Sequence, residues 1–283
     1  MSRPLESSPL GDVVRRVDAT ADGAPPRDTI PTGFPSVDRL LGGGLRRGDL
    51  IVLGGDVGSG KSALSLAIAL RTAEEGRTTA YLGGEMAVER VYERALAIEG
   101  RARIDDLRRG TLDDRTRAAI GAAAHRLSSA APHVLALPTG GADGLADELH
   151  RTLDLELAIV DPLQALSSGV RLAAEEVAES ARRLKRLAVE LEIAILVTSA
   201  LPNLSWERMD PRPVLDDFGG LGAVKQHADV ILALFREEMY AADGAEGATE
   251  LLALKNRNGP TGYVDLYFYK QWLRFEDMLD PDR

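Results

Sequence analysis

Short apolar runs alternate with longer amphipathic ones along this chain from Ile30 onward. The short runs have the length and the Val, Ile and Leu content of strands, and the longer ones have the periodicity of helices. Such alternation is typical of an α/β domain in which helices flank a mostly parallel central sheet. It predicts strands over residues 49–54, 78–83, 133–137, 157–161, 193–199, 229–235, 250–255 and 263–268.

Two segments refine this prediction. Apolar residues recur at helical spacing between two of the strands and predict a helix packed on the sheet; they are Val177, Ala181, Leu184, Ala188 and Leu191. Residues 256–262, which join the last two predicted strands, are too few for a helical crossover and suit a hairpin. The sheet is therefore expected to end in antiparallel strands at its C-terminal side.

The N-terminal residues 1–29 are rich in Pro, Ser, Asp, Ala and Arg, and they show no clear apolar periodicity. Such a segment buries too little surface to offset the entropy lost on ordering. We expect a flexible tail over residues 1–29 and one large domain over residues 30–283.

Composition narrows the possible functions. The chain has 283 residues, 45% of them apolar, no cysteine and a formal charge of −10. The absence of cysteine excludes disulfides, thiolate zinc sites and cysteine nucleophiles. The negative charge opposes nucleic-acid binding unless a locally basic surface exists.

No apolar run resembles a membrane span or a secretory signal, so we expect a cytoplasmic protein without a membrane partner. The histidines are scattered and suggest no metal site; they are His125, His133, His150 and His227.

The pattern GxxxxGK[ST] is met by Gly55, Gly60, Lys61 and Ser62, between a predicted strand and a helical run. Glycines let backbone N–H groups converge on phosphates, Lys61 reaches the terminal phosphates, and Ser62 can ligate Mg²⁺. A chance match is expected in roughly one in a hundred chains of this length, but the strand and helix around it favour ATP binding with Mg²⁺. The loop residues expected to contact ATP are Gly55, Asp56, Val57, Gly58, Ser59, Gly60, Lys61 and Ser62.

Two carboxylates follow predicted strands at the edge where a parallel sheet binds ligands. Asp161 ends an apolar strand and could hold Mg²⁺ through its water shell, although many strands end in Asp only to cap a turn. Glu85 follows another strand and could orient or deprotonate an attacking water, or it could cap the helix that begins near Met86. The phosphate loop favours the metal-binding interpretation of Asp161, but spacing alone leaves both interpretations of Glu85 open.

Several segments in one order resemble the ATPase domain of DnaB-type replicative helicases, which are hexameric motors with a RecA-like fold. The resemblance covers residues 30–277. Its segments are IPTGFPSVDRLLGGG before the phosphate loop, GEM at 84–86, AIEGRARIDDLRRG at 97–110, IVDPLQAL at 159–166 and KNRNGPTGYVDLYF at 255–268.

This resemblance implies an ATP-hydrolysing 5′–3′ helicase that acts on single-stranded DNA as a homo-hexamer. Glu85 would be the catalytic base, and Gln164, after Asp161, would lie near the nucleotide. Lys255 and Arg257 would enter the neighbouring subunit's site and neutralise charge on the γ-phosphate. Without the resemblance, these last two residues would be read as part of a solvated hairpin turn.

Two departures from the family pattern bear on coupling to DNA. Residues 199–203 read Ser-Ala-Leu-Pro-Asn, so Ala200 stands where the family usually has a glutamine that senses the terminal phosphate. Residues 217–222 read Asp-Phe-Gly-Gly-Leu-Gly, so Gly219 replaces an arginine expected to contact the DNA backbone. Arg208 and Arg212, with Trp206, could supply charge and stacking nearby, or they could belong to a solvated loop.

Three functions remain open at this stage. A DNA-dependent ATPase, as a stand-alone paralogue without the helicases' N-terminal domain, is the first hypothesis. A regulatory or assembly ATPase that forms rings without moving DNA is the second, and Ala200 and Gly219 favour it. A RadA-like recombination mediator is the third, but those proteins carry a four-cysteine zinc module.

Overall fold

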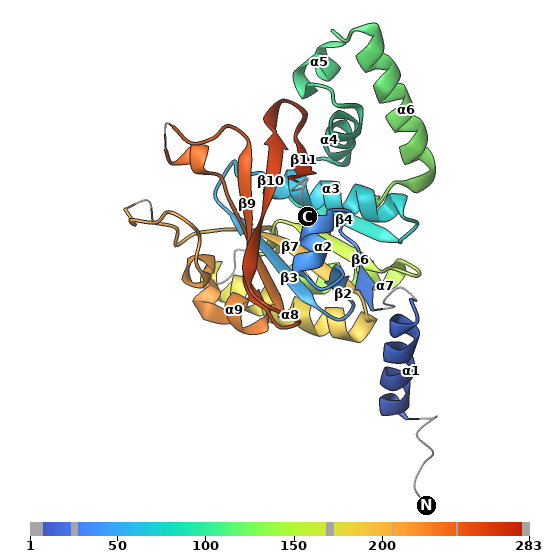
Figure 1. Ribbon diagram of the computed structural model, residues 1–283, viewed down its shortest axis with the longest axis vertical. Helices are drawn as coiled ribbons and strands as arrows, with labels where there is room; N and C mark the ends of the chain where they lie inside the picture. The colour runs from blue at the N-terminus through green and yellow to red at the C-terminus, as the bar shows by residue number, and fades with distance from the viewer. Residues whose placement is uncertain (1–7, 24–27, 168–172, 206, 242, 279–283) are drawn as a thin grey trace, which may run out of the picture.

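A computed structural model describes residues 8–23, 28–167, 173–205, 207–241 and 243–278 (Figure 1). The strands of its main sheet are β3 (Leu50–Gly55), β4 (Thr79–Gly83), β5 (His133–Ala136), β6 (Leu157–Asp161), β7 (Ala194–Ala200), β8 (Val230–Phe235), β9 (Ala248–Asn256), β10 (Gly262–Tyr269) and β11 (Arg274–Asp277). They pair in the order β11-β10-β9-β8-β3-β7-β6-β4-β5. The strands from β8 to β5 in this order are parallel, and β9, β10 and β11 are antiparallel.

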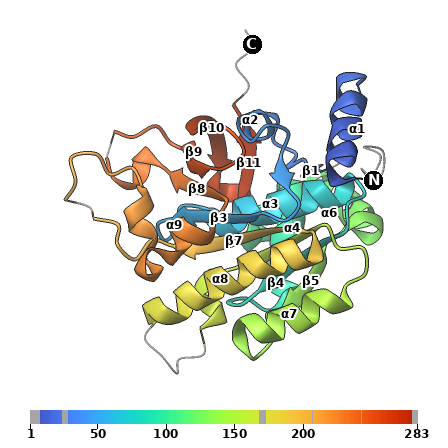
Figure 2. The ribbon, with the colours of Figure 1, turned by 90° about the horizontal axis from the view of Figure 1, so that it is seen from below.

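Helices cover both faces of this sheet, as Figure 2 shows. One face packs against α3 (Lys61–Glu74), α4 (Val88–Gly100) and α2 (Pro35–Leu40), whose apolar side chains form a core with β3, β6 and β7. The other face packs against α7 (Gly141–Arg151), α8 (Ala173–Leu191) and α9 (Ala223–His227). The two cores have different membership because successive residues of a buried strand point to opposite faces.

The remaining elements are short or peripheral. Helices α5 (Ile104–Arg109) and α6 (Asp114–Ala130) follow α4 and project from one end of the sheet in Figure 1. Strands β1 (Thr29–Ile30) and β2 (Leu45–Arg46) form a separate antiparallel pair. No helix in the described ranges is both long and apolar enough to cross a membrane.

The predicted α/β sheet is confirmed, including its antiparallel C-terminal strands. Each predicted strand lies within one or two residues of an observed one, and the predicted helix over 177–191 is the greater part of α8. The short strand β11 was not predicted. Its four residues include three charged ones, and it becomes a strand by pairing with β10.

Part of the segment expected to be a flexible tail, residues 1–29, forms helix α1 (Pro9–Ala21). The Ser8 hydroxyl accepts a hydrogen bond from the Gly11 N–H at 3.1 Å, and Pro9 occupies the first turn, as helix starts prefer. Apolar residues do recur at helical spacing along this segment, and all of them are exposed; they are Leu10, Val13, Val14 and Val17.

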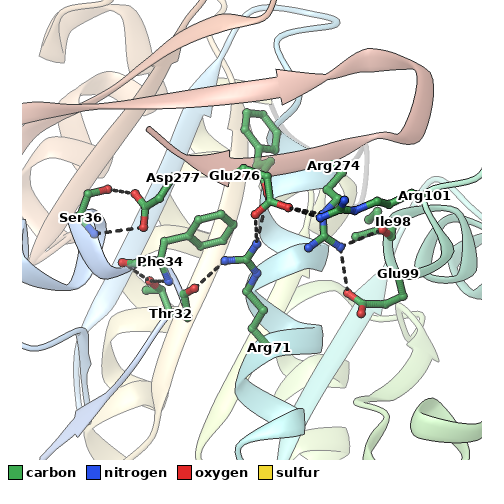
Figure 3. Close-up of polar contacts among 12 residues, drawn as sticks. Thr32, Phe34, Ser36, Arg71, Ile98, Glu99, Arg101, Arg274, Glu276 and Asp277 are labelled. Atoms are coloured by element: carbon green, nitrogen blue, oxygen red, sulfur yellow. Dashed lines mark hydrogen bonds and ion pairs between the residues drawn. The ribbon is translucent and has the colours of Figure 1, made fainter. Parts of the chain in front are cut away.

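Strand β11 is tied to the helix that follows the phosphate loop, as Figure 3 shows. The Arg71 guanidinium of α3 donates to the carbonyls of Gly33 at 2.5 Å and Phe275 at 3.2 Å and to the Glu276 carboxylate at 3.2 Å. Burial would raise the pKa of Glu276, but the hydrogen bonds and charges of Arg274 and Arg71 outweigh it and hold that pKa below its ordinary value. The C-terminal strand is therefore fixed against α3 by paired charges.

Candidate nucleotide-binding site

The phosphate loop, residues 55–62, lies between β3 and α3 at the carboxyl end of a central strand. Gly55 has a parallel neighbour on each side, Ala200 of β7 and Leu234 of β8. Gly60 has a φ of +103°, and a Cβ at this position would lie 2.8 Å from the Phe275 ring. Only glycine fits there without strain. Glycine at position 60 therefore lets the loop pass close to Phe275 as it turns into α3.

The Lys61 side chain folds back onto the phosphate loop. Its Nζ donates to the carbonyl oxygens of Gly55 at 3.0 Å and Asp56 at 2.9 Å. Burial lowers the pKa of Lys61, and the negative charges of Asp161, Asp56 and Glu85 partly offset this effect. The fold therefore brings Asp161, the predicted metal ligand, and Glu85, the predicted base, within electrostatic reach of the loop lysine.

Asp161 lies at the end of β6 and is 5% exposed. Its carboxylate accepts hydrogen bonds from Ser62 Oγ at 3.1 Å, from Tyr81 Oη at 2.6 Å and from the Thr198 hydroxyl. Burial raises the pKa of Tyr81 well above its ordinary value, and the neighbouring Asp161 charge raises it further. Tyr81 is therefore a neutral donor that fixes one carboxylate oxygen, while the other faces Ser62.

Neither Tyr81 nor Thr198 belongs to a motif that marks it as a site residue in the sequence. Each carries a hydroxyl within a buried strand that is mostly apolar, and that irregularity is the signal that could have identified them. Their role depends on the pairing of β4, β6 and β7, which brings together residues that are 80 and 37 positions from Asp161 in the sequence.

Glu85 and Gln164 lie at the same edge of the sheet. Gly83 pairs with Asp161 across β4 and β6, and the Gly84 N–H donates to the Asp161 carbonyl at 2.8 Å, so the exposed Glu85 follows directly. Gln164 bonds to the end of β7: its Nε2 donates to Ser199 Oγ at 3.1 Å, and its Oε1 accepts from the Ala200 N–H at 3.3 Å. An amide therefore does lie beside the position where Ala200 lacks one.

Lys255 and Arg257 lie near the opposite end of the sheet. Strand β9 runs antiparallel to β8, so Lys255 pairs with Ile231 near the amino end of β8, whereas the phosphate loop follows the carboxyl ends of the parallel strands. Lys255 Nζ donates to the carbonyls of Lys225 at 2.7 Å and Ala228 at 2.6 Å, at the C-terminal end of α9.

Arg257 is held in the same region. Its Nη2 donates to the Gln226 carbonyl at 2.9 Å, and its Nη1 donates to the Asp229 carboxylate at 3.1 Å. Asp229 is 3% exposed and also accepts the Leu50 N–H at 2.9 Å, at the amino end of β3. The fold therefore does not bring Lys255 and Arg257 to the phosphate loop of their own chain.

The loop that departs from the family pattern borders a cavity. This cavity has a volume of about 520 Å³, and both Ala200 and Gly219 line it. Gly219 has φ +66° and ψ −148°, which favours glycine. The cavity connects the region of Gln164 with residues 219–222.

The arginines suggested as DNA contacts bond to carboxylates of this chain. Arg208 bonds to Asp217 at 2.8 and 3.1 Å, and Arg212 bonds to Glu250 at 2.6 and 2.7 Å. The hydrogen bond with Glu250 raises the pKa of Arg212 above its ordinary value. Trp206 lies outside the described residues.

The central strand β3 of this sheet leads through the glycine-rich loop into a helix, and Asp161 ends β6, two strands away. This arrangement defines a RecA-like P-loop nucleotide-binding protein. The chain belongs to the DnaB-like helicase C-terminal domain family, whose model matches residues 29–277.

Relatives and solved structures agree with this membership. A replicative DNA helicase DnaB of Leifsonia xyli subsp. xyli (strain CTCB07) is 32% identical over 256 residues, and one of Geobacillus stearothermophilus is 31% identical over 257 residues. Each match covers 88% of this chain and 56% of the relative, so the chain spans about half the length of these proteins.

Two solved structures share the fold. One, described as an ATPase domain, has a TM-score of 0.88 at 20% identity, over 96% of this chain and 99% of that one. A DnaB-like replicative helicase, described with its interactions with primase, has a TM-score of 0.87 at 22% identity, over 96% of this chain and 68% of that one.

Proposed function

We propose that this protein binds ATP with Mg²⁺ in the phosphate loop and hydrolyses it between the subunits of a hexameric ring that acts on single-stranded DNA in the cytoplasm. One observation carries the proposal. Lys61, Asp161 and Glu85 converge on the loop at the carboxyl ends of the parallel strands. Lys255 and Arg257 lie near the amino ends of those strands. A complete set of charges then requires two chains.

The loop residues fit a nucleoside triphosphate and its metal ion. The buried Ser59 hydroxyl has no hydrogen-bond partner among the described residues, and Gly60 lets the loop turn into the α3 N-terminus at a φ that favours glycine. Ser62 and Asp161 offer oxygen atoms, the ligands that Mg²⁺ prefers, and their side chains lie 3.1 Å apart. When bound, Mg²⁺ would neutralise charge on the phosphates.

Each side chain has a distinct role in this proposal. Lys61 would exchange its two loop carbonyls for the terminal phosphates, which are stronger acceptors because they are charged. Glu85 is exposed and follows β4 at the nucleotide edge, so it can accept a proton from an attacking water. Tyr81 and Thr198 would keep Asp161 in one orientation.

Lys255 and Arg257 would act on the neighbouring subunit's γ-phosphate. Here both side chains satisfy carbonyls at the end of α9, so each must leave those acceptors to reach a phosphate. A mixing experiment tests this role: Glu85→Gln and Arg257→Ala variants, each inactive alone, should regain ATPase activity when mixed, because some interfaces then combine an intact base with an intact arginine. Equal inactivity of the mixture at all ratios would contradict action in trans.

Action on DNA is tested by the steady-state ATPase rate with Mg²⁺, measured with and without single-stranded DNA. Several-fold stimulation that disappears in Glu85→Gln would support the motor. Hydrolysis that is indifferent to DNA would support a regulatory or assembly ATPase instead. That second function is favoured by Ala200, by Gly219 and by the internal pairing of Arg208 and Arg212.

A further inference from the structure

An arginine that the phosphate-loop motif does not include lies against the loop. Arg236 follows the last residue of β8, and its side chain is only 5% exposed. Its Nη1 donates to the carbonyl oxygen of Gly58, in the middle of the loop, at 2.9 Å. A guanidinium stays charged even when buried, so its position requires strong local compensation.

That compensation comes from a carboxylate two residues further on. Arg236 Nε donates to Glu238 Oε1 at 3.0 Å, and a second guanidinium nitrogen donates to the same oxygen. Glu238 is 10% exposed and also accepts Lys270 Nζ at 2.6 Å. The Arg236 carbon Cζ lies 4.8 Å from the centre of the Phe268 ring. The guanidinium is therefore held on three sides and has little freedom to leave the Gly58 carbonyl.

The direction of this hydrogen bond matters for phosphate binding. In a trans peptide the carbonyl and the following N–H point in opposite directions. When Arg236 holds the Gly58 carbonyl outward, the Ser59 N–H points into the loop, where it donates to the Asp56 carbonyl at 3.1 Å. Amides that point inward are what a phosphate loop offers its ligand.

The same segment contacts the loop at a second point. Tyr240 Oη lies 3.4 Å from Asp56 Oδ2, and its ring stacks on Phe235 with centroids 5.3 Å apart. Burial raises the pKa of Tyr240 to about 12, with a further contribution from Asp56. Residues 236–240 therefore hold the loop at Asp56 and at Gly58.

We infer that Arg236 is a positioning residue for phosphate binding: its buried guanidinium, balanced by Glu238, keeps the Gly58–Ser59 peptide oriented for the phosphates of a nucleotide. This inference rests on the proposed function, because it concerns the same loop. It assigns a role in the ATP site to a side chain outside the phosphate-loop motif.

Arg274 offers a matched control. Like Arg236, it donates to a glutamate two residues further on, Glu276, at 2.5 Å, and to a backbone carbonyl of another element, Ile98, at 3.0 Å. Its partners lie on β11 and α4 and not on the phosphate loop. Arg236→Met and Arg274→Met therefore remove the same kinds of bonds, but only the first removes a bond to the loop.

The test measures the Kd of a fluorescent ADP with Mg²⁺, the KM and kcat for ATP, and the melting temperature without nucleotide. For Arg236→Met we expect Kd and KM to rise about tenfold, the effect of losing one charge-assisted hydrogen bond, while kcat stays within threefold. Arg236→Lys, which keeps the charge beside Glu238, should restore part of the affinity. Arg274→Met should lower the melting temperature and leave Kd within twofold.

Other outcomes overturn the inference in distinguishable ways. Unchanged Kd in a folded Arg236→Met, or an equal rise in Arg274→Met, would show that Arg236 has no specific role at the loop. If Arg236→Met does not fold, the test uses Arg236→Lys instead. A Kd of Arg236→Lys equal to that of the unmodified protein would then overturn the inference. If the unmodified protein bound no ADP, or if Lys61→Ala bound it equally well, the proposed function would fail and the inference with it.

Discussion

The hydroxyl of Tyr81 offers the sharpest test of how the site is built. Tyr81→Phe keeps the ring in its fully buried place and removes only the donor that lies 2.6 Å from Asp161 Oδ2. The cavity and transfer contributions are therefore close to zero. What remains is one hydrogen bond to a carboxylate that is 5% exposed. Hydrogen bonds to charged groups contribute roughly 1.5–3 kcal/mol, and leaving a buried acceptor without its donor gives a similar cost.

The assay is urea unfolding near pH 7.5 without nucleotide. We expect the free energy of unfolding to fall by about 1.5–3 kcal/mol, which corresponds to a loss of roughly 3–12 °C in melting temperature for a domain of this size. Tyr263→Phe is the control, because Tyr263 is 59% exposed and the same change there should cost less than about 0.5 kcal/mol. The Mg²⁺ concentration for half-maximal ATPase activity should also rise in Tyr81→Phe, since Asp161 loses its fixed orientation.

The pH dependence adds a second check. The pKa of Tyr81 is raised well above its ordinary value of 10.0, chiefly by burial and then by Asp161. A group whose folded-state pKa is raised contributes stability that is present below its unfolded pKa and is lost as the pH rises through the folded pKa. The difference in the free energy of unfolding between the unmodified protein and Tyr81→Phe should therefore be constant from about pH 7 to 9. It should shrink above about pH 10. A loss below about 0.5 kcal/mol, or an equal loss in Tyr263→Phe, would refute this account of Asp161.

Three further outcomes are expected. Glu85→Gln should lower kcat for ATP by about 10²–10⁴-fold and leave ADP affinity within twofold, and unchanged hydrolysis would remove Glu85 as the base. Gly60→Ala places a Cβ 2.8 Å from Phe275 at a φ of +103°, so ADP affinity should fall by about tenfold or more. A Gly60→Ala variant that binds ADP normally would contradict the assigned loop shape. Glu276→Gln should lower the melting temperature at pH 7 by about 2–5 °C. Because the pKa of Glu276 lies below its ordinary 4.5, this difference should narrow as the pH falls below that value, and a constant difference would show that the Arg274 ion pair contributes nothing.

Local sequence pattern was sufficient for eight strands of the main sheet and for the position of the loop. A strand that is buried on both faces must be almost wholly apolar, so β6 and β8 could be read directly from their composition. The loop from Gly55 to Ser62 could be singled out as a candidate because phosphate binding requires glycines, a lysine and a hydroxyl at set spacing. Asp161 and Glu85 followed from the rule that ligands bind at the carboxyl edge of a parallel sheet.

Local pattern failed where an element is short or depends on a distant partner. Strand β11 has four residues, three of them charged, and it exists because β10 and Arg71 hold it. Helix α1 was not predicted because the polar composition of the segment outweighed two helix signals. These signals are the N-cap residue Ser8 and a stripe of apolar residues at helical spacing. In both cases the element depends on contacts or a cap that cannot be predicted from composition alone.

The sequence by itself determined the fold class, the phosphate loop and the set of charged residues available to it, because these depend on periodicity and on short spacings along the chain. Only the tertiary structure decided how those residues are held. Tyr81 meets Asp161 across 80 positions, and Arg236 meets Gly58 across 178. Such contacts depend on which strands become neighbours, and strand order is a property of the whole sheet. The antiparallel direction of β9 places Lys255 and Arg257 at the end of the sheet away from the loop of their own chain.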